Sequence, residues 1–281
     1  MASLVVSSAA DDGYGALRAF EASRGWTAFG PDEIRDPRGV RRRRDDRFLC
    51  VNAPQGVWLL ELDGTPIARV DLPAGLEPGG GAFGHRDAYL IGSRSKRAIY
   101  HVDLRTRQFL GRALALEEIA FPRGFGVLDD GGFIVASGTH PVTREGRRAL
   151  FRYDTAGRRE RDVFVDDPQL DPLDLVIRDG YVYVTSEFPF GNDNAIVSLR
   201  RYNARNGADA GVWSAGNTPA FGTIHKPRGI AFADDGTAFI CAQNGVLAVD
   251  VTRFGAASLV AQDDRLAGQS LACGAEPASD V

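Results

Sequence analysis

Short runs in which apolar and polar residues alternate recur along the whole chain, and each run closes on an acidic or amide residue. A period of two is typical of β-strands that bury one face, and helical periods are poor throughout. The closing residues are separated by 42, 40, 51, 49 and 47 positions, so the unit repeats six times. These six residues are Glu21, Asp63, Asp103, Asp154, Asn203 and Asp250.

A second motif precedes the first in three units, where a Pro-Arg-Gly triplet leads into a strand, a turn and a second strand. The predicted turns contain Asp-Asp or Asp-Gly, and Asp-Gly favours a hairpin because it tolerates positive φ. A fourth unit has Asp179-Gly180 at the corresponding place. The triplets begin at Pro37, Pro122 and Pro227, and the turns are Asp45-Asp46, Asp129 to Gly132 and Asp234 to Gly236.

The two ends of the chain complete the pattern. Residues 266–272 have the place of a first strand, residues 4–8 of a second and residues 15–21 of a third. Repeats of roughly 40 to 50 residues with several strands each are typical of propeller blades. We therefore predict an all-β, six-bladed β-propeller of four-stranded blades, with the last blade closed by strands from both termini. The length of 281 residues suits a single domain over residues 1–281.

These motifs resemble NHL-type repeats, which share the Pro-x-Gly start, the Asp-Gly turn and the closing acidic residue. The resemblance covers nearly the whole chain, and three of the six units match well. A more distant similarity is to the gluconolactonase and strictosidine-synthase-like propellers. Lactonases carry an early Glu before Gly-Pro as a calcium ligand. Here Gln269-Ser270-Leu271 stands in that place, so this ligand does not carry over.

Composition restricts the partners and the location. The net charge of −4 offers no electrostatic footprint for nucleic acid. No apolar run approaches the roughly 18 residues of a membrane span, and the start lacks a secretory signal. We expect a cytoplasmic protein with no membrane contact. The cysteines are odd in number and lie in separate predicted strands, which indicates buried thiols rather than disulfides: Cys50, Cys241 and Cys273.

Arginines mark one end of the predicted channel. Arg38, Arg123 and Arg228 hold the same position in units one, three and five. In a six-bladed ring, alternate blades lie about 120° apart around one axis. Guanidinium groups arranged in this way can hold a carboxylate or phosphate, so we predict that the three bind a small anionic substrate. In the alternative interpretation each arginine pairs with a neighbouring acid such as Asp36. A separate run, Arg41 to Arg44, is interpreted as a solvated turn at the opposite end.

Two long loops are expected at the same end, after the second strands of units three and four. The first contains His140 and the second begins at Glu187. We predict that these two residues form a catalytic acid–base pair, because imidazole titrates near neutral pH. Phe188, Phe190 and His225 are predicted to contact the substrate. In the alternative, the second loop only caps the core.

No cofactor is predicted, because the four histidines show no metal-binding spacing. A channel calcium held by carboxylates and amides stays open. Nucleophile triads, P-loops and dinucleotide fingerprints are absent from the sequence. Two functions remain. One is a stand-alone propeller enzyme of hydrolase, lyase or isomerase/cyclase type that acts on a small anionic molecule. The other is a non-catalytic scaffold with a protein partner, as the NHL resemblance implies. The long loops, and the expectation of no fused domain, favour the enzyme. The calcium candidates are Asp11, Asn52, Asp174, Glu187 and Gln243.

Overall fold

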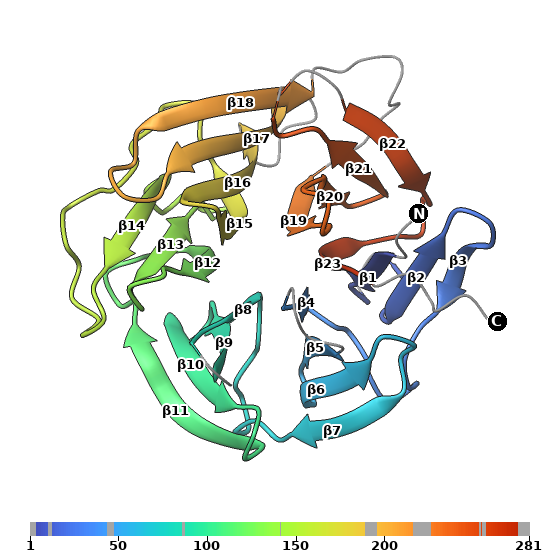
Figure 1. The fold of residues 1–281 in the computed structure, drawn as a ribbon. Helices are drawn as coiled ribbons and strands as arrows, with labels where there is room; N and C mark the ends of the chain where they lie inside the picture. Colours follow the sequence, from blue (N-terminus) through green and yellow to red (C-terminus); the bar gives the residue numbers. More distant parts are fainter. Residues whose placement is uncertain are drawn as a thin grey trace.

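Six small antiparallel sheets surround a central channel, so the chain is an all-β, six-bladed β-propeller (Figure 1). The computed structural model describes residues 4–10, 13–43, 48–85, 88–140, 142–188, 196–215, 226–252, 254 and 257–274. These residues form strands and no helix. The predicted fold class and the resemblance to six-bladed propellers are confirmed.

Each blade begins with its innermost strand, and the blades follow the chain around the ring. Blade one has β4 (Gly39–Arg42), β5 (Phe48–Ala53), β6 (Gly56–Glu61) and β7 (Pro66–Val70). Blade two has β8 (Gly81–Phe83), β9 (Ala88–Ser93), β10 (Ala98–Asp103) and β11 (Gln108–Ala115). Blade three has β12 (Pro122–Val127), β13 (Phe133–Ser137) and β14 (Ala149–Tyr153). Blade four has β15 (Pro172–Arg178), β16 (Tyr181–Phe188), β17 (Ile196–Asn203) and β18 (Asp209–Ala215). Blade five has β19 (Pro227–Phe232), β20 (Ala238–Ala242), β21 (Gly245–Val249) and β22 (Ala257–Gln262).

The sixth blade contains both ends of the described chain, as predicted. Its strands are β23 (Gly268–Cys273), β1 (Leu4–Ser8), β2 (Leu17–Glu21) and β3 (Gly25–Ala28). Leu4 pairs with Cys273 on one side and with Phe20 on the other. The N-terminal strand therefore joins the C-terminal strand to the rest of the blade and closes the ring without leaving an open sheet edge there.

The turns between first and second strands form where the sequence predicts them. Asp179 and Gly180 have φ values of 51° and 76°, and Gly131 and Gly236 also have positive φ. These values suit Asp and Gly in tight hairpins. The predicted turn at Asp45-Asp46 lies outside the described residues.

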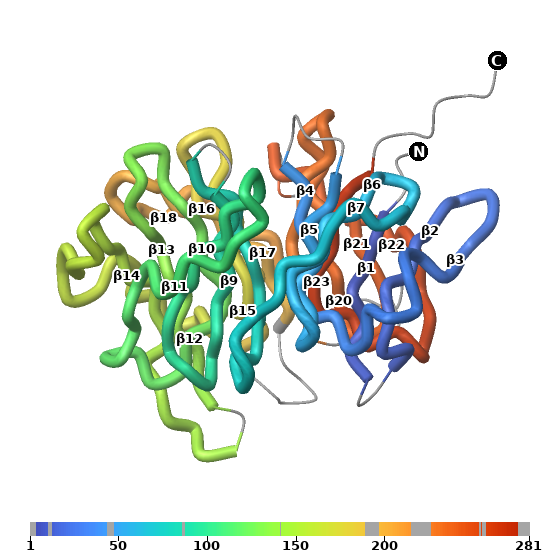
Figure 2. The backbone as a smooth tube through the Cα atoms, turned by 90° about the horizontal axis from the view of Figure 1, so that it is seen from below, coloured from blue at the N-terminus to red at the C-terminus, as the bar shows by residue number. Residues whose placement is uncertain are grey.

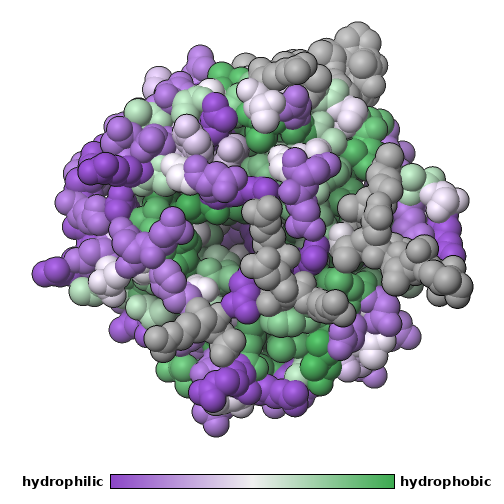
Figure 3. Space-filling model, viewed as in Figure 1, coloured by the Kyte–Doolittle hydropathy of each residue, from purple (hydrophilic) through white to green (hydrophobic). Residues whose placement is uncertain are grey.

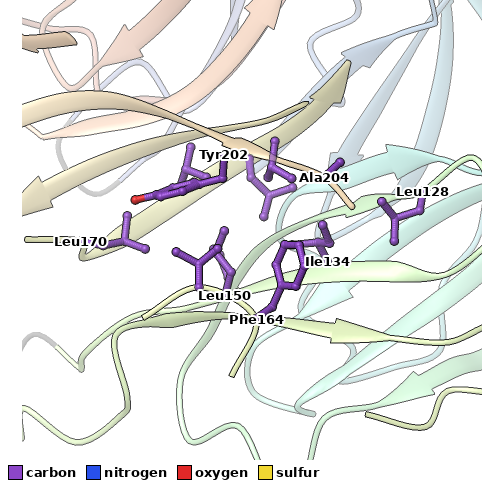
Figure 4. Close-up of a cluster of buried hydrophobic side chains, with 12 residues drawn as sticks. Leu128, Ile134, Leu150, Phe164, Leu170, Tyr202 and Ala204 are labelled. Atoms are coloured by element: carbon purple, nitrogen blue, oxygen red, sulfur yellow. The ribbon is translucent and has the colours of Figure 1, made fainter. Parts of the chain in front are cut away.

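Blade three differs from the prediction, because its sheet has three strands rather than four. The segment expected as its outer strand pairs with β14 only at two isolated bridges, Leu150–Val165 and Tyr153–Arg159. Phe164 and Val165 are instead buried between blades three and four, against residues such as Tyr202 (Figure 4). Burial of these side chains in the inter-blade core replaces a regular ladder.

The two faces of the ring differ in their loops. Turns between first and second strands lie at one end, and loops between second and third strands lie at the other. Figure 2 shows that the loop between β13 and β14 extends beyond the ring. The three cysteines are buried and form no disulfide, as predicted. No helix of the described residues is long and apolar enough to cross a membrane. The cytoplasmic location stays a prediction.

Candidate functional site at one end of the channel

Arginines from four blades converge where the innermost strands begin. Arg38 immediately precedes β4, while Arg123 and Arg228 are the second residues of β12 and β19. A fourth arginine, Arg94, follows β9 in blade two. Blades two and five, and blades three and five, are not neighbours in the ring, so their residues approach one another only near the axis. Arg228 acts electrostatically on both Arg94 and Arg123, which places the three at the channel mouth.

The electrostatics of this cluster show how crowded it is. Burial, and then the charges of Arg94 and Arg228, lower the pKa of Arg123 to about 9. Burial, and then Arg228 and Arg38, lower the pKa of Arg94. Burial also lowers the pKa of Arg228. Like charges in a desolvated place disfavour one another, so burial and the neighbouring guanidinium groups both act against the charges of Arg94 and Arg123.

Phe121 lies under two of these arginines. The guanidinium carbons of Arg94 and Arg123 lie 4.8 Å and 4.4 Å from the centre of its ring. Stacking on an aromatic face partly compensates a guanidinium for lost water and holds its plane in one orientation. Neither Phe121 nor Arg94 stands at a repeated motif of the sequence. Arg94 follows the second strand of its unit, at the end where functional loops are expected, whereas no sequence signal points to Phe121.

Glu187 contributes a carboxylate from blade four. It is the penultimate residue of β16 and is only 2% exposed. Its charge opposes the lowering of the pKa of Arg123 and of Arg228, which places it beside both. A strand residue with this burial is held in a fixed position, so the predicted catalytic carboxylate lies next to the predicted anion-binding arginines.

A hydrogen-bonded network holds Arg123 against blade four. Arg123 Nη2 donates to the carbonyl oxygen of Thr139 (2.8 Å), and the Thr139 hydroxyl donates to Asp171 (2.8 Å). Burial raises the pKa of Asp171, while the hydrogen bonds from Thr139 and the charge of Arg123 oppose this effect. Gly138 makes room for the network, because a Cβ there would lie 2.8 Å from Arg123 Nε and 3.0 Å from Asp171 Oδ1.

Arg38 is arranged differently from the other two predicted arginines. Its Nη2 lies 2.6 Å from Asp36 Oδ2, and both side chains are partly exposed. For this arginine the alternative of a local acid partner is therefore observed, although Arg38 also lies close enough to lower the pKa of Arg94.

The hydrogen bonds of the His140 side chain are made within its own loop. Its Nδ1 accepts hydrogen bonds from the backbone N–H groups of Val142 (3.2 Å) and Thr143 (3.1 Å). Its ring packs edge-on against Phe121, with centroids 5.1 Å apart. Among the described residues, none of the contacts of His140 is with Glu187. The structure does not join the predicted acid–base pair, and the pairing stays a prediction.

The remaining predicted substrate contacts lie at the edge of the described site. Phe188 ends β16, is half-buried and packs under Arg148, whose guanidinium carbon is 4.8 Å from the ring centre. Phe190 and His225 lie outside the described residues. The described residues contain no group of three or more His, Cys, Asp or Glu side chains placed to hold a metal ion. Asp174, one of the calcium candidates, binds Arg41 instead.

That ion pair also corrects the interpretation of the arginine run. Arg41 is a buried residue of β4 rather than part of a solvated turn, and its Nη2 lies 2.5 Å from Asp174 Oδ2. Arg41 also donates to the oxygens of Gly81 (2.9 Å) and Ser270 (2.9 Å). Period-two alternation places Arg41 on the channel side of β4, where the Asp174 carboxylate from blade four and these two oxygens compensate its burial. The pair crosses the channel between its two mouths.

Comparisons with known proteins identify the fold. No family model matches the sequence, and no curated protein matches it. One similar solved structure is a chain from a nidogen/laminin complex (TM-score 0.68, 12% identity, covering 98% of this chain and 99% of that chain). Another is a protein of unknown function from Bacteroides caccae (TM-score 0.67, 11% identity, 98% and 99%). A streptogramin B lyase is also similar (TM-score 0.56, 14% identity, 93% and 74%). At such identities the likeness shows the six-bladed propeller fold alone.

Proposed function

We propose that this chain is an enzyme that binds a small anionic molecule between Arg94, Arg123 and Arg228. The observation that carries the proposal is their convergence, in which burial and neighbouring guanidinium groups lower the pKa of Arg94 and of Arg123. Although carboxylates lie nearby, the pKa values of Arg94, Arg123 and Arg228 are still lowered from their ordinary value. A carboxylate or phosphate between them would relieve this unfavourable state and accept paired N–H donors.

The reaction that this set of residues supports best is proton transfer next to the bound anionic group. Glu187 is the buried carboxylate beside Arg123 and Arg228 and would accept the proton. The guanidinium groups would stabilise the negative charge that develops on the substrate. In isomerase chemistry Glu187 would return the proton at a second position, and in lyase chemistry the electron pair would expel a leaving group as the proton is taken. Hydrolysis would also need an activated water. The similar streptogramin B lyase has the same fold, which is compatible with this choice.

His140 would act as a hydrogen-bond donor to the substrate in this scheme. Since its Nδ1 accepts backbone hydrogen bonds, a neutral imidazole carries its proton on Nε2. Closure of the 137–148 loop over a bound substrate would be needed for that N–H to reach the reacting group. The catalytic role of His140 thus depends on a contact that forms with substrate.

The experiment compares ligand stabilisation and turnover in matched variants. Citrate and a library of small organic acids are screened by thermal shift against sodium chloride of equal ionic strength, and hits are followed for conversion by NMR. We expect citrate to stabilise the wild type and Arg123→Gln to lose at least about ten-fold in affinity, because one charge-assisted hydrogen bond contributes about 1.5–3 kcal/mol. Glu187→Gln should retain binding of a converted hit and lose its turnover.

Arg147→Gln is the matched control, since Arg147 is half-exposed on the same loop region and pairs with the surface acids Asp162 and Asp166. It should behave as the wild type. If no acid stabilises the wild type beyond the salt effect, the anion site is wrong. Recovery of a specific protein partner in that case would favour the scaffold instead.

A further inference from the structure

The opposite end of the channel contains a cavity of about 300 Å³. It is lined by the parts of the innermost strands that lie beyond Arg41, in all six blades. Figure 3 shows this face, with a hollow near the axis and hydrophilic side chains around it. The volume is at the lower end of the range of about 300–1,000 Å³ that small-molecule sites occupy.

The Arg41–Asp174 ion pair separates this cavity from the arginine cluster. Arg41 contributes to the cavity lining, but its Nε, Nη1 and Nη2 donate to Gly81, Ser270 and Asp174. A guanidinium with these partners forms a fixed floor. Ligands at the two ends would therefore not share binding groups.

The walls and the rim of the cavity differ in chemistry. The walls are apolar and partly aromatic, and they come from several blades: Phe83, Phe125, Val127, Ile177, Ala231 and Phe232. The rim is cationic, with Arg42, Arg43 and Arg178 against one carboxylate, Asp234, among the described lining residues. An apolar interior under a positive rim suits a molecule with an apolar body and an anionic head.

Arg178 is the rim cation best placed to hold the head group. Its guanidinium carbon lies 4.9 Å from the centre of the Phe232 ring, which fixes its plane beside an apolar wall. Its Nη1 donates to Ala233 (3.0 Å) and its Nε lies 3.2 Å from the exposed Asp179. No described residue accepts a hydrogen bond from Nη2 of Arg178, so this guanidinium still has a donor to offer.

We propose that this cavity is a second ligand site, which takes a small amphipathic carboxylate with its alkyl or aromatic body between the apolar walls and its carboxylate at Arg178. The site is separate from the one at the arginine cluster and does not depend on the function proposed there. Binding would bury the apolar part of the ligand and leave its head at the water-exposed rim.

Calorimetric titration with sodium octanoate, and with octan-1-ol as the uncharged analogue, tests the site on the full chain. Octanoate should bind more tightly than octanol. Arg178→Gln should weaken octanoate about two- to five-fold, the range for an ion pair that is partly solvated. Ala231→Phe, which fills the cavity from β19, should remove detectable binding. Val127→Phe fills it from β12 and gives the same test if the first variant fails to fold, as judged by circular dichroism.

Two controls locate the binding. Arg24→Gln changes an exposed arginine in a turn at the same end of the ring, outside the cavity, and should bind octanoate as the wild type does. The titrations are also made in an Arg123→Gln background, so that octanoate held by the arginine cluster at the other end is not counted as binding in this cavity. Absence of octanoate binding to Arg123→Gln, or binding that survives both cavity-filling changes made in that background, would overturn the site. Equal binding of octanol and octanoate would overturn the role of the rim.

Discussion

The two ends of the channel are built by the same six strands, yet their chemistry is opposite. Where the innermost strands begin, guanidinium groups crowd around a buried carboxylate, and burial lowers the pKa of Arg94, Arg123 and Arg228. Where the same strands end, apolar side chains enclose a cavity and the arginines lie at its rim. The repeat therefore determines where a side chain points, while the individual residues decide what each end can bind.

The boundary between the two ends is a single buried ion pair. The side chains of Arg41 and Asp174 are 10% and 9% exposed, and the pair joins blade one to blade four across the channel. Buried pairs add little net stability over an apolar replacement, but removal of one partner leaves an uncompensated charge. The separation of the two ends therefore depends on the contact between Arg41 and Asp174.

The largest effect is expected for Asp174→Ala, which leaves the Arg41 guanidinium buried without its carboxylate. We expect a loss of about 3–5 kcal/mol in the free energy of unfolding, measured by urea denaturation. Asp71→Ala is the control, because its partner Arg69 is on the exposed surface, and it should cost less than about 1 kcal/mol. Equal losses in the two variants would contradict the inference that Arg41 depends on Asp174 to compensate its buried charge.

A smaller effect is expected for Gly138→Ala at the arginine end. The new Cβ would lie 2.8 Å from Arg123 Nε and 3.0 Å from Asp171 Oδ1. The hydrogen-bonded network of Arg123, Thr139 and Asp171 must therefore shift, at a cost of about 1–3 kcal/mol. Citrate affinity at the arginine cluster should fall, while octanoate binding in the cavity at the other end should not change. Gly80→Ala, where a Cβ meets no atom within 4 Å, should change stability by less than about 0.5 kcal/mol. A fall in octanoate affinity in Gly138→Ala would mean that the two ends are coupled.

The smallest effect is a pH dependence confined to the arginine end. The pKa of Arg123 is lowered to about 9 in the folded protein, so its charge is complete below that pH and is lost as the pH rises through it. Citrate affinity should therefore decrease a few-fold between pH 8 and about pH 10. The unfolded chain keeps the proton in this range, so the contribution of Arg123 to the free energy of unfolding should rise with pH. Calorimetric titration of citrate across this range checks the prediction, and Arg123→Gln is the variant that should lose the pH dependence of the affinity.

Local signals in the sequence determined the fold and part of the site. Period-two alternation and Asp-Gly turns act between neighbouring residues, so they predicted the six blades, the strands and the closure by both termini. Repeat position also brought Arg123 and Arg228 to one end, because equivalent residues of a ring face one axis. Glu187 was expected at the same end because it stands where the second strand of its unit closes. His140 was assigned to the correct loop, but its hydrogen bonds to Val142 and Thr143 could not be read from its residue type.

The tertiary structure alone decided what lies between and beyond these positions. Arg41 and Asp174 are 133 residues apart, so no local pattern distinguishes a buried ion pair from a solvated turn. Arg94 joins the cluster through packing on Phe121, and Phe164 leaves its strand position because the space between blades three and four can bury it. Such contacts depend on which side chains meet across blades, and hydrophobic patterning specifies only that a face is buried, not the partner that it meets.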